Sequence, residues 1–345
     1  MKIRWEVLLA VISVFLTVIF ILVLQRPQSR TLPLPSENTE ILPINAGEKE
    51  TEAFLKKNGI DEAMQSIVSQ GSINCHVKAR DIGLLAYKLF DSKALDYYSQ
   101  GCFFGYYHGA IEGFFDAKGI GDLNYQAGNI CGNLQGKAKY SCLHGLGHAV
   151  LGASDYDLPK ALRHCENIKD LRYSYQCING VFMENILNIH GYSQFISLND
   201  FFYPCNSSVV ANKLKDQCYL INSTMAHSQG RTFAMGKCDS IEADHRGACY
   251  MGFGVNPDSC ISVPARYRDD CVAWGVFVVL GSEEEQGVIS LCSSLHSEKE
   301  DRHACYENIA NISQAALLNS KEQKDLCGRF PDEFVSSCLS ISSSN

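Results

Sequence analysis

The sequence contains no two cysteines separated by two residues, although it has sixteen cysteines in 345 residues. This absence excludes thioredoxin-like redox motifs, zinc ribbons and c-type haem attachment, because each requires a Cys-x-x-Cys pair. Sixteen cysteines are far too many for a reducing compartment unless they bind metal clusters. The even number therefore favours eight disulfides, formed in an oxidising space.

Familiar catalytic motifs are also missing. There is no Gly-x-Ser-x-Gly elbow, P-loop, dinucleotide fingerprint or His-Glu-x-x-His motif.

Positive charge is scarce as well, since the chain beyond residue 30 carries 26 basic against 37 acidic residues, a formal charge of −11. A chain this acidic is a poor ligand for polyanions, so we expect no nucleic acid and no anionic lipid surface as a partner.

One long hydrophobic run occurs, at residues 5–24, with Glu6 as its single charge. It is long enough to cross a bilayer and has no small-residue cleavage site, which favours an uncleaved signal anchor over a cleaved signal peptide. Because every cysteine follows it, we expect residues 1–4 in the cytoplasm and the body in the periplasm or outside the cell. Residues 25–50 carry four prolines and are expected to form an extended linker to a repeat domain over residues 51–345.

The cysteines fall into pairs with a nearly constant spacing of 11 to 13 residues. Seven such spacings in succession indicate a repeat, and the two remaining cysteines would pair across a longer segment. The predicted disulfides are Cys75 with Cys102, Cys131 with Cys142, Cys165 with Cys177, Cys205 with Cys218, Cys238 with Cys249, Cys260 with Cys271, Cys292 with Cys305, and Cys327 with Cys338.

Each unit has the pattern of a helical hairpin closed by its own disulfide. Asp157 is a typical N-cap residue and Pro159 suits the first turn of a helix, and the helix that begins here would end at Cys165. A second helix is expected from Asp170 to Ile189, through Cys177. Strand signals are sparse, so the fold class is all-α: about seven to eight hairpins stacked as an irregular α-solenoid, preceded by one transmembrane helix. Irregular insertions are expected, notably at residues 190–204.

Glycine recurs three residues after the second cysteine of several units. Because glycine costs a helix about 1 kcal/mol relative to alanine, its recurrence predicts close approach of a neighbouring helix. The four positions are Gly105, Gly145, Gly180 and Gly252.

The run from Lys160 to Cys165, followed by Gln176, Cys177 and Gly180 at the start of the next helix, resembles the disulfide-stapled, tetratricopeptide-like repeat proteins secreted by some bacteria. The resemblance covers the architecture of residues 75–340, although the units here vary more in length. It implies an extracytoplasmic α-solenoid, a fold usually used for binding, and assigns no catalytic residue.

Five polar residues share one face of successive second helices when each helix is drawn at 100° per residue. This face could pack against a neighbouring helix, line a groove, or hold a zinc-like divalent metal ion. Two pairs, His108 with Glu112 and His144 with His148, have the i, i+4 spacing that lets two ligands on one helix turn bind the same cation. The candidates are His108, Glu112, His144, His148 and His227.

The leading hypothesis is a module that binds a protein, peptide or glycan in the groove lined by the histidine-bearing helices. One alternative is a metal-binding protein or metal-dependent hydrolase that uses His108, Glu112, His144 and His148. Another is an envelope structural protein without a discrete ligand. In all of these, histidines that serve only as hydrogen-bonding fillers remain an alternative, and His245 is expected to be a surface residue.

Overall fold

The computed structural model describes residues 40–71, 75–97, 99, 101–187, 191, 193–197, 199–228, 235–280, 285–315 and 319–342, without the side chains of residues 103, 227, 228, 315 and 342. Residues 42–345 form one compact unit. No helix within the described ranges is long and apolar enough to span a lipid bilayer. The predicted anchor and most of the predicted linker lie outside those ranges.

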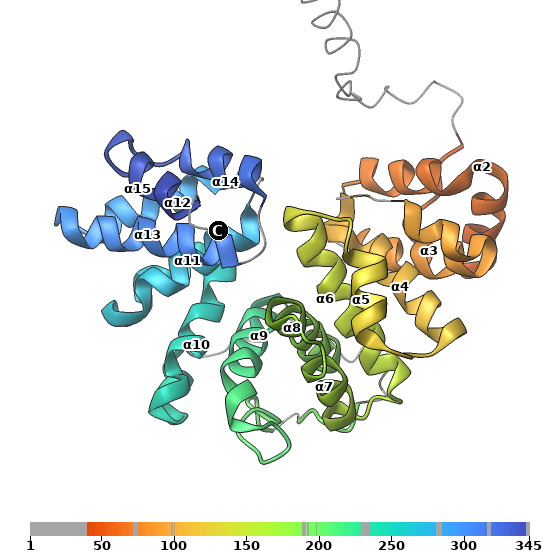
Figure 1. The fold of residues 1–345 in the computed structure, drawn as a ribbon, viewed down its shortest axis with the longest axis horizontal. Helices are drawn as coiled ribbons and strands as arrows, with labels where there is room; N and C mark the ends of the chain where they lie inside the picture. The colour runs from red at the N-terminus through yellow and green to blue at the C-terminus, as the bar shows by residue number, and fades with distance from the viewer. Residues whose placement is uncertain are drawn as a thin grey trace, which may run out of the picture. The chain divides into compact units, whose positions relative to one another are not determined.

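The fold is all-α, and no strand occurs in the described part of the chain (Figure 1). Short 3₁₀ turns connect several of the helices. The α-helices are α2 (Glu48–Ser69), α3 (Cys75–Phe90), α4 (Gly105–Lys118), α5 (Leu123–Cys131), α6 (Gly136–Ala153), α7 (Leu158–Glu166), α8 (Leu171–Leu187), α9 (Lys215–Ser228), α10 (Arg246–Met251), α11 (Arg268–Val279), α12 (Glu285–Leu295), α13 (Lys299–Ala315), α14 (Ser320–Cys327) and α15 (Asp332–Ser342).

Eight disulfides join the sixteen cysteines, and each links the two residues that the spacing pairs. No cysteine is free. Nearly all of the bridges belong to one hydrophobic core that runs from Tyr107 to Cys338, so they are packed among apolar side chains. A second core, from Leu42 to Ala110, lies around α2, α3 and α4.

Four units are hairpins of two α-helices: α5 with α6, α7 with α8, α12 with α13, and α14 with α15. As expected, Asp157 caps α7, where its side chain accepts a hydrogen bond from the backbone N–H of Lys160. Three other units differ from the expected hairpin. Their first cysteines, Cys205, Cys238 and Cys260, lie in a turn or in short 3₁₀ segments instead of α-helices, and Pro257 begins the segment that contains Cys260.

The second helices of the units pack on one another in chain order: α4 on α6, α6 on α8, α8 on α9, α9 on α10, α10 on α11, α11 on α13, and α13 on α15 (Figure 1). The first helices α5, α7 and α14 pack mainly on their own partners, whereas α12 packs more on α11 of the preceding unit than on α13. The result is a layer of successive second helices, and it brings side chains from neighbouring units into contact.

Glycines make these contacts close, as their recurrence predicts. A Cβ built on Gly180 of α8 would overlap the carbonyl oxygen of His144 on α6, and one on Gly147 would overlap the carbonyl of Cys177. The prediction is confirmed at all four positions, since a Cβ at Gly105, Gly145, Gly180 or Gly252 would meet a neighbouring element at less than 3.0 Å. The backbones of α6 and α8 therefore contact each other directly at these glycines, with no room for a side chain between them.

The compact unit begins before the boundary expected from composition. Leu42 is fully buried, and its backbone N–H donates to Ser66 Oγ at 2.7 Å. The helix α2 already begins at Glu48. The last residues of the predicted linker, 42–50, are therefore part of the folded unit, because the buried side chain of Leu42 anchors them on α2.

The N-terminal end of α6 also contacts elements far along the chain. The backbone N–H of Lys137 donates to Glu322 Oε2 at 3.3 Å, across 185 residues of sequence. The Lys137 ammonium donates to the carbonyl oxygen of Leu280, and the rings of Tyr140 and Phe277 lie edge to face at 4.9 Å. These contacts add α11 and α14 to the surroundings of α6.

Candidate functional site

Three of the candidate histidines meet between α4 and α6. The ring centroid of His108 lies 5.8 Å from that of His144 and 5.0 Å from that of His148, and the two α6 rings are 4.8 Å apart. All three residues are buried, with 5%, 6% and 3% of their surface exposed. The i, i+4 spacing of His144 and His148 places both rings on the face of α6 that meets α4. We call these three residues the histidine cluster.

A buried network of charges borders the histidine cluster. Both guanidinium NH₂ groups of Arg80, on α3, donate to the carboxylate of Glu184, on α8, at 3.0 and 3.1 Å. Arg80 Nε donates to Glu112 Oε2 at 2.8 Å. Glu184 is fully buried, and its Oε2 also lies 2.8 Å from His148 Nδ1. The network therefore links α3, α4, α6 and α8 through one carboxylate.

The electrostatics of the network keep its carboxylate charged. Burial alone would raise the pKa of Glu184, but the hydrogen bond with His148 and the charge of Arg80 lower that pKa to about 2. An ionised carboxylate only accepts hydrogen bonds, so His148 Nδ1 is the donor. In a neutral imidazole, the lone pair of His148 then resides on Nε2.

The other two imidazoles are held neutral. Burial, together with the nearby His148, places the pKa values of His108 and His144 well below their ordinary value. A neutral imidazole offers one nitrogen as an acceptor or a metal ligand.

Three ring nitrogens of the cluster have no hydrogen-bond partner: His108 Nδ1, His144 Nδ1 and His148 Nε2. Their opposite nitrogens are engaged. His108 Nε2 lies 3.4 Å from Ser141 Oγ, and His144 Nε2 lies 3.3 Å from Met183 Sδ. Buried polar atoms are normally paired, so three unpaired nitrogens within one cluster require an explanation.

The structure pairs Glu112 with another residue and does not describe the side chain of His227. The Glu112 carboxylate binds Arg80, whereas the expected arrangement had it share a cation with His108. The side chain of His227 lies outside the described residues. Sequence reasoning did not find Arg80 or Glu184, although a glutamate within the apolar sequence VFMENIL was an available signal.

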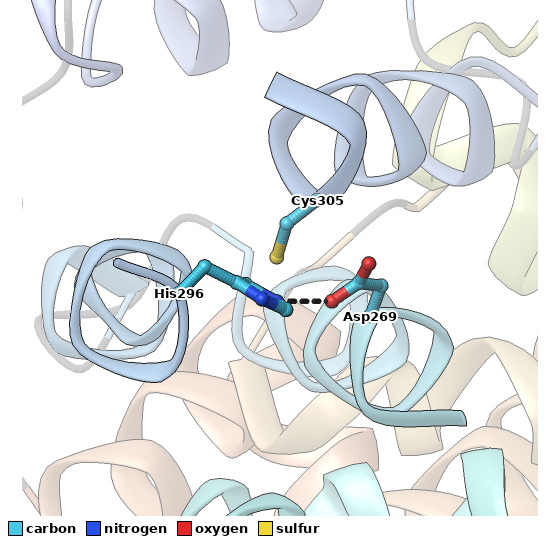
Figure 2. A group of neighbouring side chains, drawn as sticks. All are labelled: Asp269, His296 and Cys305. Carbon is cyan, nitrogen blue, oxygen red and sulfur yellow. Dashed lines mark hydrogen bonds and ion pairs between the residues drawn. The ribbon is translucent and has the colours of Figure 1, made fainter. Parts of the chain in front are cut away.

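A second group of potential metal ligands lies between α11, the end of α12 and α13 (Figure 2). One ligand atom from each of Asp269, His296 and Cys305 lies within 4.8 Å of the others. However, the sulfur of Cys305 is bonded to Cys292, which removes the thiolate that would bind a metal. What remains is an ion pair in which His296 Nε2 lies 2.6 Å from Asp269 Oδ1. This group is better explained as a structural contact.

An apolar pocket of about 310 Å³ opens between α6, α8, α10, α11 and α13. Four aromatic side chains line it: Tyr140, Tyr175, Trp274 and Phe277. We call it the aromatic pocket. Its remaining lining residues are Leu171, Arg172, Gln176, Asn179, Met251 and Ile312.

The aromatic pocket adjoins the histidine cluster through one residue. Tyr140 lies one helix turn before His144, and the two rings are parallel within 8° at a centroid distance of 6.1 Å. On its other side, Tyr140 contacts Phe277. Both features are therefore built on α6, one at its N-terminal half and one at its centre.

His245 differs from expectation, since it is buried with 5% of its surface exposed. Its Nδ1 lies 2.7 Å from Asp216 Oδ1, and its Nε2 lies 3.3 Å from Asn212 Oδ1. Both ring nitrogens are thus paired, and the residue ties α9 to the start of α10.

Comparisons with models of known protein families, with curated proteins and with solved structures found no match to this chain.

Proposed function

We propose that this protein is a membrane-anchored, extracytoplasmic binding module that captures a peptide segment of a partner protein in the aromatic pocket. In this proposal, residues 5–24 are the anchor, and the stacked hairpins form an irregular α-solenoid of the tetratricopeptide-like kind. Eight disulfides support an oxidising location. The succession of packed second helices supports the solenoid.

The observation that carries the proposal is the composition of the aromatic pocket. Its volume of about 310 Å³ lies at the lower end of the range for ligand sites, which suits one or two side chains. The lining is mainly apolar and aromatic. A sugar would leave hydroxyl groups without partners there, at a cost of about 1–3 kcal/mol each, so an apolar peptide side chain is the better fit.

Residues at the rim of the pocket support a protein partner. Leu171 is 83% exposed, and Tyr175 is 41% exposed. Exposed apolar side chains beside a pocket are typical of protein interaction sites, and tyrosine is enriched among the residues that dominate binding energy. The exposed Arg172 beside them favours a segment that also carries an acidic residue.

The rival functions fit less well. A hydrolase that used His108, Glu112, His144 and His148 would need to admit its substrate to them, yet the three histidines are buried and Glu112 is paired with Arg80. A purely structural envelope protein would have no use for an apolar pocket with exposed aromatic residues at its rim.

The test uses a Trp5→Phe variant of the full-length chain, in which Trp274 of the pocket is the sole tryptophan. A random-peptide phage library is selected on this protein. We expect enriched peptides with a large apolar side chain, and we expect the synthetic peptides to change the emission of Trp274. Tyr175→Ala should weaken their binding about tenfold, the loss of roughly 1.4 kcal/mol expected for an interface tyrosine.

The matched control is Tyr125→Ala on α5, because Tyr125 is 66% exposed and does not line the pocket. This variant should bind the peptides as well as its parent does. Equal binding by the Tyr175→Ala variant would contradict the proposal. Capture of glycans from an array, with no selection of peptides, would also contradict it.

A further inference from the structure

The unpaired nitrogens of the histidine cluster indicate a ligand other than a protein group. A buried donor or acceptor without a partner costs about 1–3 kcal/mol, and three of them occur together here. Histidines that served only as packing would be paired, as both nitrogens of His245 are. We propose that His108, His144 and His148 bind one divalent transition-metal ion of the zinc class.

Two of the three ring separations match those of imidazoles that share one ion. With metal–nitrogen distances of about 2.0–2.1 Å and tetrahedral angles, two imidazoles on one zinc ion have centroids roughly 5 Å apart. The three separations in the cluster are 4.8, 5.0 and 5.8 Å. The ring nitrogens of the three histidines do not all lie within 4.8 Å of one another, whereas one ligand atom from each of Asp269, His296 and Cys305 does. Metal binding therefore requires at least one imidazole to rotate.

Each ligand nitrogen follows from the contacts of the opposite side of its ring. His148 binds through Nε2, because its Nδ1–H donates to Glu184. His108 and His144 bind through Nδ1, since their Nε2 atoms face Ser141 and Met183. A histidine ligand whose other nitrogen donates to a carboxylate is the usual outer-shell arrangement, and it fixes both the tautomer and the orientation of the ring.

The charge of the surroundings also favours a cation. With neutral imidazoles, Arg80, Glu112 and Glu184 carry a net formal charge of −1 within hydrogen-bonding distance of His148 or of one another. Arg80 donates to both carboxylate oxygens of Glu184, including the Oε2 that His148 contacts. Glu184 is thus a positioning residue for the site, and Arg80 keeps its carboxylate in place.

Three protein ligands leave a fourth position on a tetrahedral ion. The thioether of Met183, beside His144, is a soft group that suits copper better than zinc. Imidazoles bind both metals, so the experiment includes each. Magnesium and calcium prefer oxygen ligands and serve as negative controls.

The experiment uses the full-length chain with its disulfides intact, stripped with a chelator and then dialysed against zinc, copper, magnesium or calcium. Elemental analysis should find one zinc or copper ion per chain and no magnesium or calcium. Cobalt(II) should give the visible absorption bands of a low-coordinate nitrogen site. Glu184→Gln should weaken zinc affinity about 10–100-fold, the usual effect of removing an outer-shell carboxylate.

The decisive variant is His108→Ala/His144→Ala/His148→Ala, which should bind no metal. Its control is His296→Gln/His303→Gln, which removes two histidines outside the cluster and should bind like the parent. The cobalt spectrum and zinc stoichiometry of the unaltered chain keep the proposal open to refutation even if the triple variant fails to fold. Absence of zinc, copper and cobalt binding by the unaltered chain would overturn the proposal, as would loss of binding in the control.

Discussion

Oε2 of Glu184 lies 2.8 Å from Nδ1 of His148, and the same carboxylate receives two hydrogen bonds from Arg80. Arg80 and Glu184 are separated by 104 residues of sequence. A single carboxylate thus joins α3 to α6 and α8. Both the stability of the first units and the orientation of the histidine cluster depend on it.

Glu184→Ala should destabilise the protein by about 3–5 kcal/mol, because it leaves Arg80 buried with only Glu112 as its charge partner. The measurement is the free energy of unfolding in urea, with the disulfides intact. Glu242→Ala is the matched control, since the ion pair of Glu242 with Lys215 is 63% exposed on the glutamate side. That control should leave the free energy of unfolding almost unchanged, because solvent screens an exposed ion pair.

Stability should fall with acid in two stages. The pKa values of His108 and His144 lie below 6.5 in the folded state, so below about pH 6.5 the unfolded chain binds protons that the folded chain does not. The free energy of unfolding should therefore decrease as the pH falls through that region, by about 1.4 kcal/mol per pH unit for each histidine.

The second stage belongs to Glu184, whose pKa falls from 4.5 to about 2 on folding. Its contribution of about 3 kcal/mol is present above pH 4.5 and is lost as the pH falls toward about 2. Urea denaturation across this range, with a chelator present, measures both stages. His108→Asn/His144→Asn should remove the first stage and keep the second. A first stage that is unchanged in this variant would refute the assignment.

The sequence was most informative where a pattern repeats. The spacing of the cysteines predicted which residues pair, and the glycine three residues after Cys142 or Cys177 predicted a close helix contact. Both follow from local geometry that each unit repeats. The three units whose first cysteines are Cys205, Cys238 and Cys260 were harder to predict, because turns and short 3₁₀ segments carry no 3.6-residue periodicity.

The site was only partly predictable for a different reason. Helical phase placed His144 and His148 on one face and matched them with His108. The partners of these histidines come from other units, and no periodic signal relates Arg80 to Glu184. The aromatic pocket collects Tyr140, Tyr175 and Trp274 from distant helices, so it depends on the tertiary fold.

Gly180→Ala should destabilise the protein by about 1–3 kcal/mol, because the new methyl group would overlap the carbonyl of His144 and push α8 away from α6. Gly152→Ala is the control in the same pair of helices, since nothing lies within 4 Å of a Cβ built there. That change should stabilise the protein by up to about 1 kcal/mol through helix propensity. Thermal denaturation of both variants is the measurement, and opposite signs are the expected result. Equal effects would refute the close-contact explanation.

Removal of one disulfide should cost about 3 kcal/mol if its effect is the entropy of a small closed loop. Cys131 with Cys142 and Cys327 with Cys338 each span 11 residues, so the loop term is the same for both. Both cysteines of a bridge are replaced by serine, once at the internal unit and once at the last unit. Comparing the two variants therefore separates the entropy of the closed loop from packing in the core. A larger cost at the internal unit, measured by urea denaturation, would assign the difference to packing in the core.

Trp274 should report the state of the aromatic pocket without any ligand. It lines the pocket but is only 6% exposed, and its indole N–H donates to Thr224 Oγ1 at 3.1 Å. In the Trp5→Phe background, its emission should be blue-shifted relative to the unfolded chain and poorly quenched by acrylamide. Tyr175→Ala should increase quenching because it removes an exposed side chain from the rim, whereas Tyr125→Ala should leave quenching unchanged. If Tyr175→Ala has no effect on quenching, Tyr175 does not control access to Trp274, and the rim of the pocket must be assigned to other residues.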